Sequence, residues 1–203
     1  GLSWPHFGWG ALGWYAALLL RAPVVGVASL LKVPESTLQL VAVLASGPCE
    51  EGVRAAVLFG WPGQHDLASA FSIGVGWASI EAAFTVVNAI AVAHLMQQKT
   101  EKAREARQQI RKVYGDGYLK QSPWLGPLER VSANMVHISF SLLTGLHPAV
   151  ALPAALAHSA MNLSVVKAAK RFGLPRTECA FFGVAGVLFV VSLAARGFWR
   201  GAQ

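Results

Sequence analysis

Residues 67–96 read LASAFSIGVGWASIEAAFTVVNAIAVAHLM, thirty residues in which Glu81 is the one Asp, Glu, Lys or Arg. A helix rises about 1.5 Å per residue, so about 20 such residues cross a hydrocarbon core of about 30 Å. A soluble fold of 203 residues cannot bury several helices of this length on all sides. The stretch therefore predicts a membrane-spanning helix.

Apolar stretches of similar length recur along the chain and set its organisation. We expect one domain over residues 1–203, with spans at about 8–31, 36–60, 67–96, 127–146, 149–166 and 177–199. The first span contains Arg21, Ala22 and Pro23, which predict a kink or a partly interfacial segment there. The fold class that follows is all-α: a polytopic membrane bundle of about six transmembrane helices.

The charge of the chain is concentrated between the spans. Its residues are 54% hydrophobic and 13% charged, with a formal net charge of +7. The basic residues gather in two short segments, 97–126 and 167–176, without the interleaved aromatic residues of nucleic-acid channels. We therefore expect the lipid bilayer as a partner and no nucleic acid. Because basic loops face the cytoplasm, both segments are predicted to be cytoplasmic.

Four of the predicted spans carry an ionisable side chain near the middle: Glu50, Glu81, His137 and His158. Counting about 1.5 Å per residue from the start of each span places all four about 15–21 Å deep. A charged side chain at such a depth costs about 2.5–3.5 kcal/mol on insertion scales, so it marks a functional site by default. We therefore expect the four side chains to meet in one site.

Two neighbouring carboxylates and an arginine share the second span. Glu50 and Arg54 are four residues apart, a spacing that allows an ion pair and lowers the cost of burying both charges. Glu51 points about 100° away from Glu50 on the same helix. One carboxylate could therefore face the site while the other holds Arg54, and the sequence leaves open which does which.

Polar residues also follow the ionisable ones at helical spacing in two other spans. Asn162 lies four residues after His158, on the same helix face. Thr85 and Asn88 extend a polar stripe from Glu81. We expect these side chains to support the site.

The donor types at this depth suit a metal ion. Two imidazoles and a carboxylate are ligands for Zn²⁺ that leave one position for water. The predicted metal ligands are His137, His158 and Glu81. Such a metal lowers the pKa of water to about 7, and a second carboxylate, Glu50 or Glu51, can take the proton. The Asn162 amide can donate to a developing oxyanion, so the set predicts a metallohydrolase.

The same side chains suit two other functions. Buried Glu–Arg and His–Asn pairs form interhelical hydrogen bonds, which would serve a non-catalytic scaffold. A transport pathway would show broken helices in corresponding halves of the chain, and only the first span carries a break. The sequence leaves open which substrate is cleaved and whether the chain forms a homo-oligomer. Because it opens at Gly1, it also leaves open whether another helix lies upstream.

An ordered series of polar motifs runs from about residue 47 to residue 162. It consists of Glu50-Glu51-x-x-Arg54, Ile80-Glu81-Ala82, Glu129-Arg130 ahead of His137, and His158-x-x-x-Asn162. The series resembles the YhfC family of bacterial membrane proteins, which is grouped with the CPBP superfamily of CAAX prenyl endopeptidases and PrsW-type proteases. The resemblance implies an intramembrane metalloprotease of a bacterial or archaeal plasma membrane, acting on a membrane protein or peptide.

The resemblance also implies roles for particular residues. Its pattern places at the catalytic centre Glu50 or Glu51, which would activate water, with His137, His158 and Asn162. The residues expected to support this centre are Arg54, Glu81, Asn88 and Glu129. The CAAX peptidases carry one more residue between their glutamate pair and their arginine, so their prenylated substrate is not carried over.

The superfamily also contains a non-proteolytic relative, the anterior-pharynx-defective scaffold subunit of gamma-secretase. Its glutamate-x-x-arginine spacing is similar to that of Glu51 and Arg54 here, and it keeps membrane histidines. The resemblance therefore implies the fold directly, and it implies either a metal-dependent peptidase or a scaffold.

Overall fold

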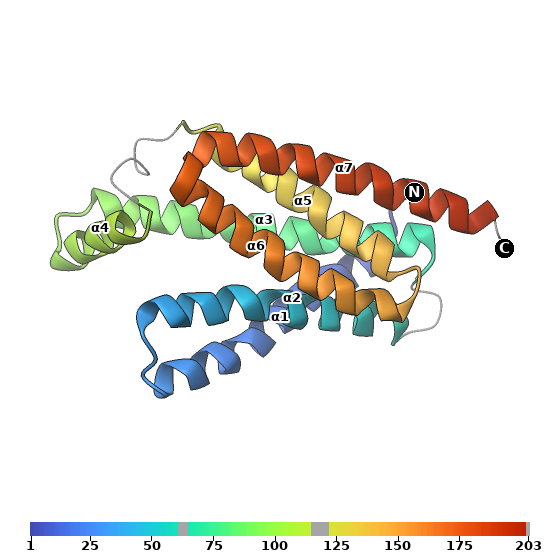
Figure 1. Ribbon diagram of the computed structural model, residues 1–203, viewed down its shortest axis with the longest axis horizontal. Coiled ribbons are helices and arrows are strands. Elements are labelled where there is room, and N and C mark those ends of the chain that lie inside the picture. The colour runs from blue at the N-terminus through green and yellow to red at the C-terminus, as the bar shows by residue number, and fades with distance from the viewer. Residues whose placement is uncertain (61–64, 115–121, 202–203) are drawn as a thin grey trace.

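A computed structural model describes residues 1–60, 65–114 and 122–201, with side chains over 1–60, 65–109 and 122–198. The described chain is all-α and forms a helical bundle, as predicted (Figure 1). Its helices are α1 (Trp4–Leu30), α2 (Glu35–Phe59), α3 (Leu67–Gln97), α4 (Glu101–Tyr114), α5 (Leu125–Thr144), α6 (Ala151–Phe172) and α7 (Leu174–Gly201). A short 3-10 helix, η2 (Pro148–Val150), precedes α6.

The helices differ from the predicted spans at several bounds: the helix predicted at 149–166 continues to Phe172, and the one predicted at 177–199 begins at Leu174. α1 continues through Pro23 as one helix of 27 residues. Proline removes one backbone hydrogen bond. The helix does not end there, because in an apolar environment its other backbone groups would find no hydrogen-bond partner outside the helix. Segment 97–126, predicted as a loop, contains the separate helix α4. Residues 115–121 of that segment lie outside the described part of the chain.

Among the described residues, four helices are long and apolar enough to cross a membrane. They cover Trp4–Leu30, Leu67–Gln97, Pro148–Phe172 and Leu174–Phe198. Large apolar side chains on these helices point outward; Leu19, Val87 and Val187 are 71%, 65% and 66% exposed. Such surfaces suit contact with hydrocarbon and not with water. α2 and α5, which carry Glu50, Glu51, Arg54 and His137, are not among the four.

Six of the helices form a closed ring. Each packs against its neighbours in the order α1, α2, α6, α7, α5, α3 and back to α1. Because the ring closes, α2 and α5 face each other across its interior as well. Side chains that point inward from α2, α3, α5 and α6 therefore share one interior space.

α1 and α3 approach each other closely through small residues. A Cβ at Gly10 would lie 2.0 Å from the carbonyl oxygen of Ile73, and one at Gly76 would lie 2.0 Å from that of Phe7. Only glycine permits this separation, because real Cβ atoms do not come so near a carbonyl oxygen. The close approach brings Trp14 of α1 beside Trp77 of α3 in a buried cluster.

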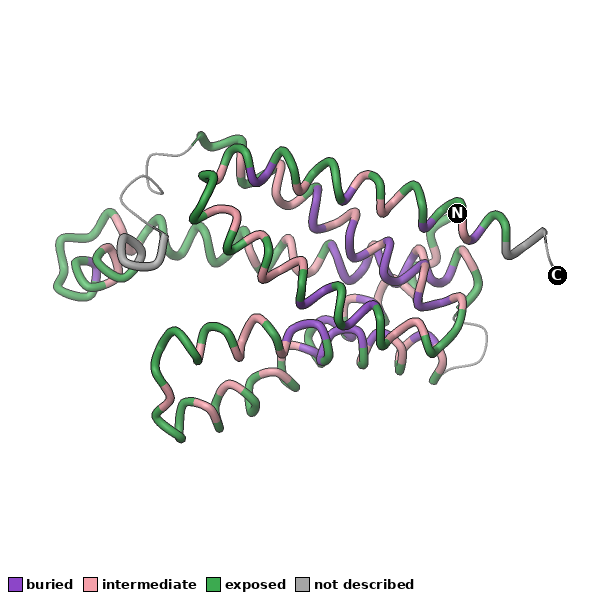
Figure 2. Tube along the Cα trace, viewed as in Figure 1, coloured by how far each residue is buried: buried purple, intermediate pink, exposed green. Residues whose placement is uncertain are grey.

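The two ends of the bundle are different. Both termini lie at one end, and α4 lies at the other end together with the α6–α7 connection (Figure 1). The described part of basic segment 97–126 and the whole of segment 167–176 therefore lie at the same end. Buried residues concentrate toward the end with the termini, whereas α4 and the α1–α2 connection are mostly exposed (Figure 2).

Candidate functional site

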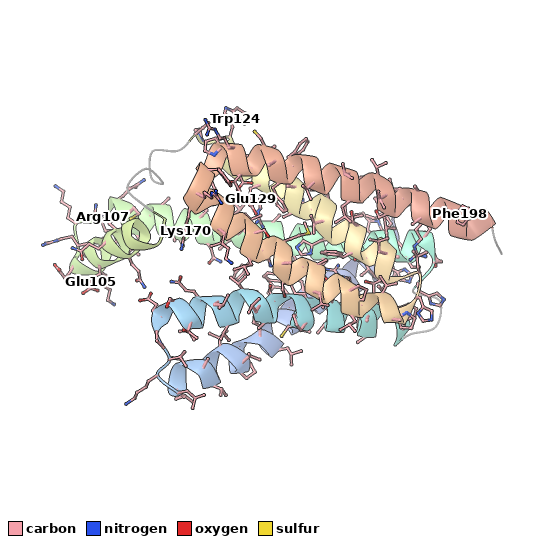
Figure 3. All side chains as sticks on the ribbon, viewed as in Figure 1. Glu105, Arg107, Trp124, Glu129, Lys170 and Phe198 are labelled. Carbon is pink, nitrogen blue, oxygen red and sulfur yellow. The ribbon has the colours of Figure 1, made fainter. Side chains whose placement is uncertain are left out.

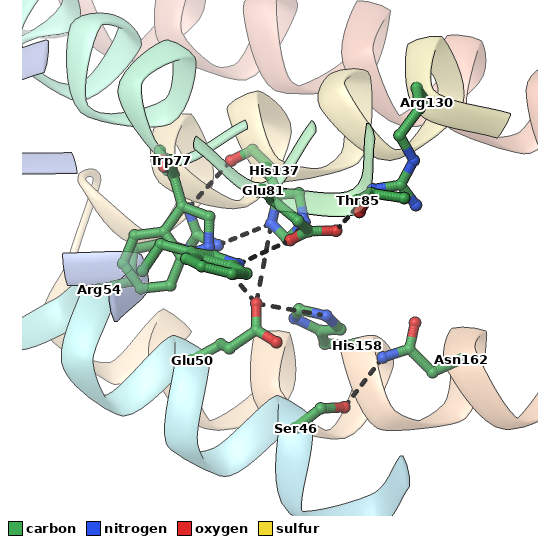
Figure 4. Close-up of polar contacts among 12 residues, drawn as sticks. Ser46, Glu50, Arg54, Trp77, Glu81, Thr85, Arg130, His137, His158 and Asn162 are labelled. Atoms are coloured by element: carbon green, nitrogen blue, oxygen red, sulfur yellow. Dashed lines mark hydrogen bonds and ion pairs between the residues drawn. The ribbon is translucent and has the colours of Figure 1, made fainter. Parts of the chain in front are cut away.

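Four helices contribute ionisable side chains to one place inside the ring (Figure 4). α2 supplies Glu50, Glu51 and Arg54, α3 supplies Glu81, α5 supplies His137, and α6 supplies His158. All are buried except Glu81, which is partly buried. The four side chains expected from their depth to meet do lie together.

Arg54 organises the base of the site. It is fully buried, and its Nε donates to Glu51 Oε2 at 2.9 Å. Its Nη1 donates to the His137 carbonyl oxygen at 3.2 Å and to Ser141 Oγ at 2.6 Å. The guanidinium also stacks over the ring of Trp77, 4.1 Å from its centroid. Glu51 is therefore the carboxylate that holds Arg54, which leaves Glu50 to face the interior.

The tautomer of His137 follows from its contacts. Arg54 Nη2 lies 3.1 Å from His137 Nδ1, and a guanidinium can only donate, so Nδ1 accepts and carries no proton. The other ring nitrogen, Nε2, lies 2.7 Å from Glu81 Oε2. A neutral His137 therefore donates from Nε2 to Glu81. A metal ion that took the place of this proton would be bound by Nε2.

His158 is oriented by a carboxylate. Its Nδ1 lies 2.9 Å from Glu51 Oε1, so Nδ1 carries the proton and donates to the carboxylate. In the neutral ring Nε2 would carry the lone pair; it lies 3.8 Å from Glu50 Oε2. The ring stacks on Phe140, with centroids 5.4 Å apart. A carboxylate on the far nitrogen is the arrangement that orients metal-binding and catalytic imidazoles.

Three of these groups could hold a metal ion. Donor atoms of Glu50, Glu81 and His137 all lie within 4.8 Å of one another. Ligand atoms around one zinc ion lie roughly 3–4 Å apart, so a small inward movement of the side chains would suffice. The predicted ligand set had His158 in place of Glu50. Because His158 donates to Glu51, it lies beside this group, with only Nε2 directed toward Glu50.

Glu81 is held by firm contacts on both oxygens. Trp14 Nε1 donates to Oε2 at 3.0 Å, and Arg130 Nη1 donates to Oε1 at 3.2 Å. Arg130 also donates to Thr85 and pairs with its neighbour Glu129. The polar groups at Glu81, Thr85 and Glu129 thus form one chain of contacts through Arg130.

Glu50 has looser contacts than Glu81. Within the described part of the chain its nearest donor is Trp77 Nε1, 3.4 Å from Oε2, and Arg21 Nη1 lies 3.9 Å from Oε1. The sequence did not place Trp14, Trp77 or Arg21 at the site. The two indoles occur in apolar stretches where tryptophan is ordinary, so no sequence pattern marks them as hydrogen-bond donors to the site.

The remaining predicted residues divide between the site and the surface. Asn162 lines the interior cavity, and its Nδ2 donates to Ser46 Oγ at 2.9 Å. Ser46 in turn donates to the carbonyl oxygen of Val43. Asn88 is exposed and lies outside the described lining of the cavity, so it does not support the site. Asn88 lies on the same helix face as Glu81 and Thr85, but residues 86–94 of α3 are all exposed, so the helix has left the packed interior there.

A cavity of about 590 Å³ opens above these groups. Its polar lining includes Arg21, Glu50, Glu81, Glu129, Arg130, His137, His158 and Asn162. Its apolar lining includes Trp14, Leu18, Val43, Phe84, Val136, Met161, Val165 and Phe181. The volume falls in the range of ligand-binding sites, and a few polar groups converge within it.

The chain matches no protein-family model, no curated protein and no solved structure. The chemistry of the site itself is therefore the guide to its function.

Proposed function

We propose that this chain is a membrane-embedded, metal-dependent peptidase that cleaves a membrane protein or peptide. The observation that carries the proposal is the convergence of Glu50, Glu81 and His137 donor atoms within 4.8 Å at a cavity. Imidazole and carboxylate donors favour Zn²⁺ as the ion. When bound, such an ion would supply Lewis acidity toward a carbonyl oxygen and make water a better nucleophile.

The side chains divide the remaining work. Glu81 is fixed by Trp14 and Arg130 and suits a ligand role. Glu50 has its nearest described donor at 3.4 Å. A carboxylate has two oxygens, so Glu50 could bind the ion through one and accept a proton from water through the other.

His158 and Asn162 line the cavity on the facing helix. Of the two, Asn162 suits a substrate carbonyl, since its amide could donate to a developing oxyanion instead of to Ser46.

The proposal extends to the arrangement in the membrane and to the family. Six helices would cross the bilayer, α2 and α5 being shielded in the ring by their apolar neighbours. The basic segments 97–126 and 167–176 would face the cytoplasm of a bacterial or archaeal plasma membrane. The ordered motifs support membership in the YhfC family of the CPBP superfamily.

A scaffold is the second candidate function, and one observation favours it. Each carboxylate of the site already has an arginine partner from this chain: Glu50 with Arg21, Glu51 with Arg54 and Glu81 with Arg130. The Glu50–Arg21 pair joins α2 to α1, and the Glu81–Arg130 pair joins α3 to α5. Polar contacts between helices stabilise bundles in this way. In this reading the site holds the ring together and cleaves nothing.

The test is a cleavage assay on protein purified in detergent. A library of apolar peptides is incubated with wild type, with Glu50→Gln and with the surface control Glu101→Gln, and products are mapped by mass spectrometry. The peptidase predicts cleavage that a chelator abolishes, and a loss of about 10²–10⁴-fold in Glu50→Gln alone. Cleavage that survives Glu50→Gln and the chelator would contradict it. No cleavage by any folded form would favour the scaffold.

A further inference from the structure

A second cavity lies between α6 and α7, apart from the donor atoms of the site. Its volume is about 430 Å³. Apolar residues make up most of its lining, which includes Met161, Val165, Phe172, Ala180, Phe181 and Val184. Phe172 and Val184 are 53% and 55% exposed, so the cavity opens on the outer surface of the bundle. In a membrane this opening faces lipid.

The cavity is about as deep as one leaflet of a bilayer. On α6 its lining extends from Met161 to Phe172, about 16 Å at 1.5 Å per residue. On α7 it extends from Arg176 to Val184, about 12 Å. Half of a hydrocarbon core of about 30 Å is about 15 Å. The dimensions match a single acyl chain that enters from the end with the basic segments.

The end of the cavity nearest the α6–α7 connection is positively charged. Arg176 lines the cavity itself, and the guanidinium of Arg171 stacks over the Phe172 ring, 5.1 Å from its centroid. Segment 167–176 contains four basic residues and no acidic one. Among the described residues no carboxylate forms an ion pair with Arg171 or Arg176. Two guanidinium groups are thus available at the mouth of an apolar cavity.

We propose that this cavity binds one anionic phospholipid, with an acyl chain between α6 and α7 and the phosphate at Arg171 and Arg176. Basic pockets between transmembrane helices commonly bind the head groups of acidic lipids. Planar guanidinium groups suit phosphate oxygens. Met161, Val165 and Phe181 line this cavity and the central one alike, so the bound lipid would border the site. The proposal does not depend on peptidase activity.

Lys170 provides a matched control. It belongs to the same basic segment but lines a different hollow, with Glu35 of α2 and Glu105 of α4. The figure places Lys170 on the side of α6 that faces α4 (Figure 3). Removing its charge changes the net charge of the segment as much as removing Arg176 does, without touching the cavity.

The experiment is native mass spectrometry of delipidated protein given equal amounts of phosphatidylglycerol and phosphatidylcholine. We expect one phosphatidylglycerol per chain to be retained in preference to phosphatidylcholine. Arg171→Ala and Arg176→Ala should each weaken retention about fivefold, and Lys170→Ala should leave it unchanged. Equal retention of the two lipids, or equal loss in Lys170→Ala, would overturn the proposal.

A second variant tests the apolar half of the cavity. Ala180→Trp places an indole where the acyl chain would lie and leaves both arginines in place. We expect it to lose phosphatidylglycerol while it elutes as a single species in gel filtration. If Ala180→Trp aggregates, Ala168→Leu makes the same test with a smaller side chain. Retention in a folded Ala180→Trp, or dimers of delipidated protein joined through α6 and α7, would show that the cavity has another occupant.

Discussion

Arg54 makes four hydrogen bonds and one aromatic contact from a fully buried position. Those contacts pair it with Glu51, fix the proton of His137 on Nε2 and join α2 to α5. The residue therefore decides both the charge balance and the donor geometry of the site. Its role is positional, since it is held below the cavity and does not line it.

Arg54→Ala leaves the Glu51 carboxylate buried without its cation. Breaking a buried pair in this way costs about 3–5 kcal/mol, so we expect a large loss of thermal stability in detergent. Arg104→Ala is the control: its pair with Glu101 is mostly exposed and is worth less than about 1 kcal/mol. Equal melting temperatures for the two variants would contradict the role given to Arg54.

For single residues, the sequence predicted where the main polar groups lie and left open which carboxylate pairs with Arg54. Charged and imidazole side chains stand out in apolar helices, so Glu50, Glu81, His137 and His158 could be found by depth alone. The division of labour between Glu50 and Glu51 could not, because it depends on how far α2 is rotated in the ring. Trp14 and Trp77 gave no signal because tryptophan is ordinary in apolar stretches.

The elements of the fold are held together differently on the two sides of the ring. α1 and α3 meet through glycines whose backbones nearly touch the opposite helix, whereas α6 and α7 leave a cavity between them. Long apolar stretches predicted where the membrane-length helices lie, although α6 and α7 extend beyond the predicted spans. The closed order of helices was not, because it depends on which faces carry small residues, and a single sequence does not rank those faces.

Gly76→Ala should separate α1 from α3. The added Cβ would lie 2.0 Å from the carbonyl oxygen of Phe7, and backbone cannot yield as a side chain can. We expect a loss of about 1–3 kcal/mol in thermal or denaturant unfolding. Gly186→Ala on α7 is the matched control, because nothing lies within 4 Å of its Cβ position. A Gly76→Ala protein as stable as Gly186→Ala would mean that the helices are not so close.

The start of α3 predicts a dependence on pH. Asp66 accepts hydrogen bonds from the backbone N–H of Ala68 and Ser69 at 2.8 and 3.0 Å. Burial acts to raise the pKa of Asp66, but the hydrogen bonds from Ser69 and Ala68 outweigh it and hold the pKa below its ordinary value. The stabilisation is therefore present above the unfolded pKa of about 3.9 and is lost as pH falls through the lower folded value.

The measurement is the unfolding of wild type and Asp66→Ala between pH 3 and pH 7. Near neutral pH the variant should be less stable by about 1 kcal/mol, the usual value of an N-cap. The difference should shrink at the acid end of the range. Asp66→Asn keeps a cap without an ionisable group, so its stability should not show this acid-dependent loss. A difference that stays constant down to pH 3 would contradict the assignment.

The whole molecule is a ring of helices with the ionisable groups of the site inside and many large apolar side chains outside. The outward apolar side chains explain why long apolar stretches in the sequence predicted membrane-spanning helices. Of the three predicted ligands, Glu81 and His137 belong to the group that could hold a metal ion, and His158 lies beside it. The group depends on three helices, α2, α3 and α5, meeting at one depth. The contact of His158 with Glu51 depends on the packing of α6 against α2.

The central claim is that the Glu50, Glu81 and His137 cluster binds a metal ion. The most direct test is the metal content of protein purified without chelators, for wild type, His137→Ala and the exposed control His94→Ala. We predict about one zinc ion per chain in wild type and His94→Ala, and none in a His137→Ala protein that still elutes as a folded species. Wild type without metal after zinc is added back, or zinc retained in His137→Ala, would contradict the claim.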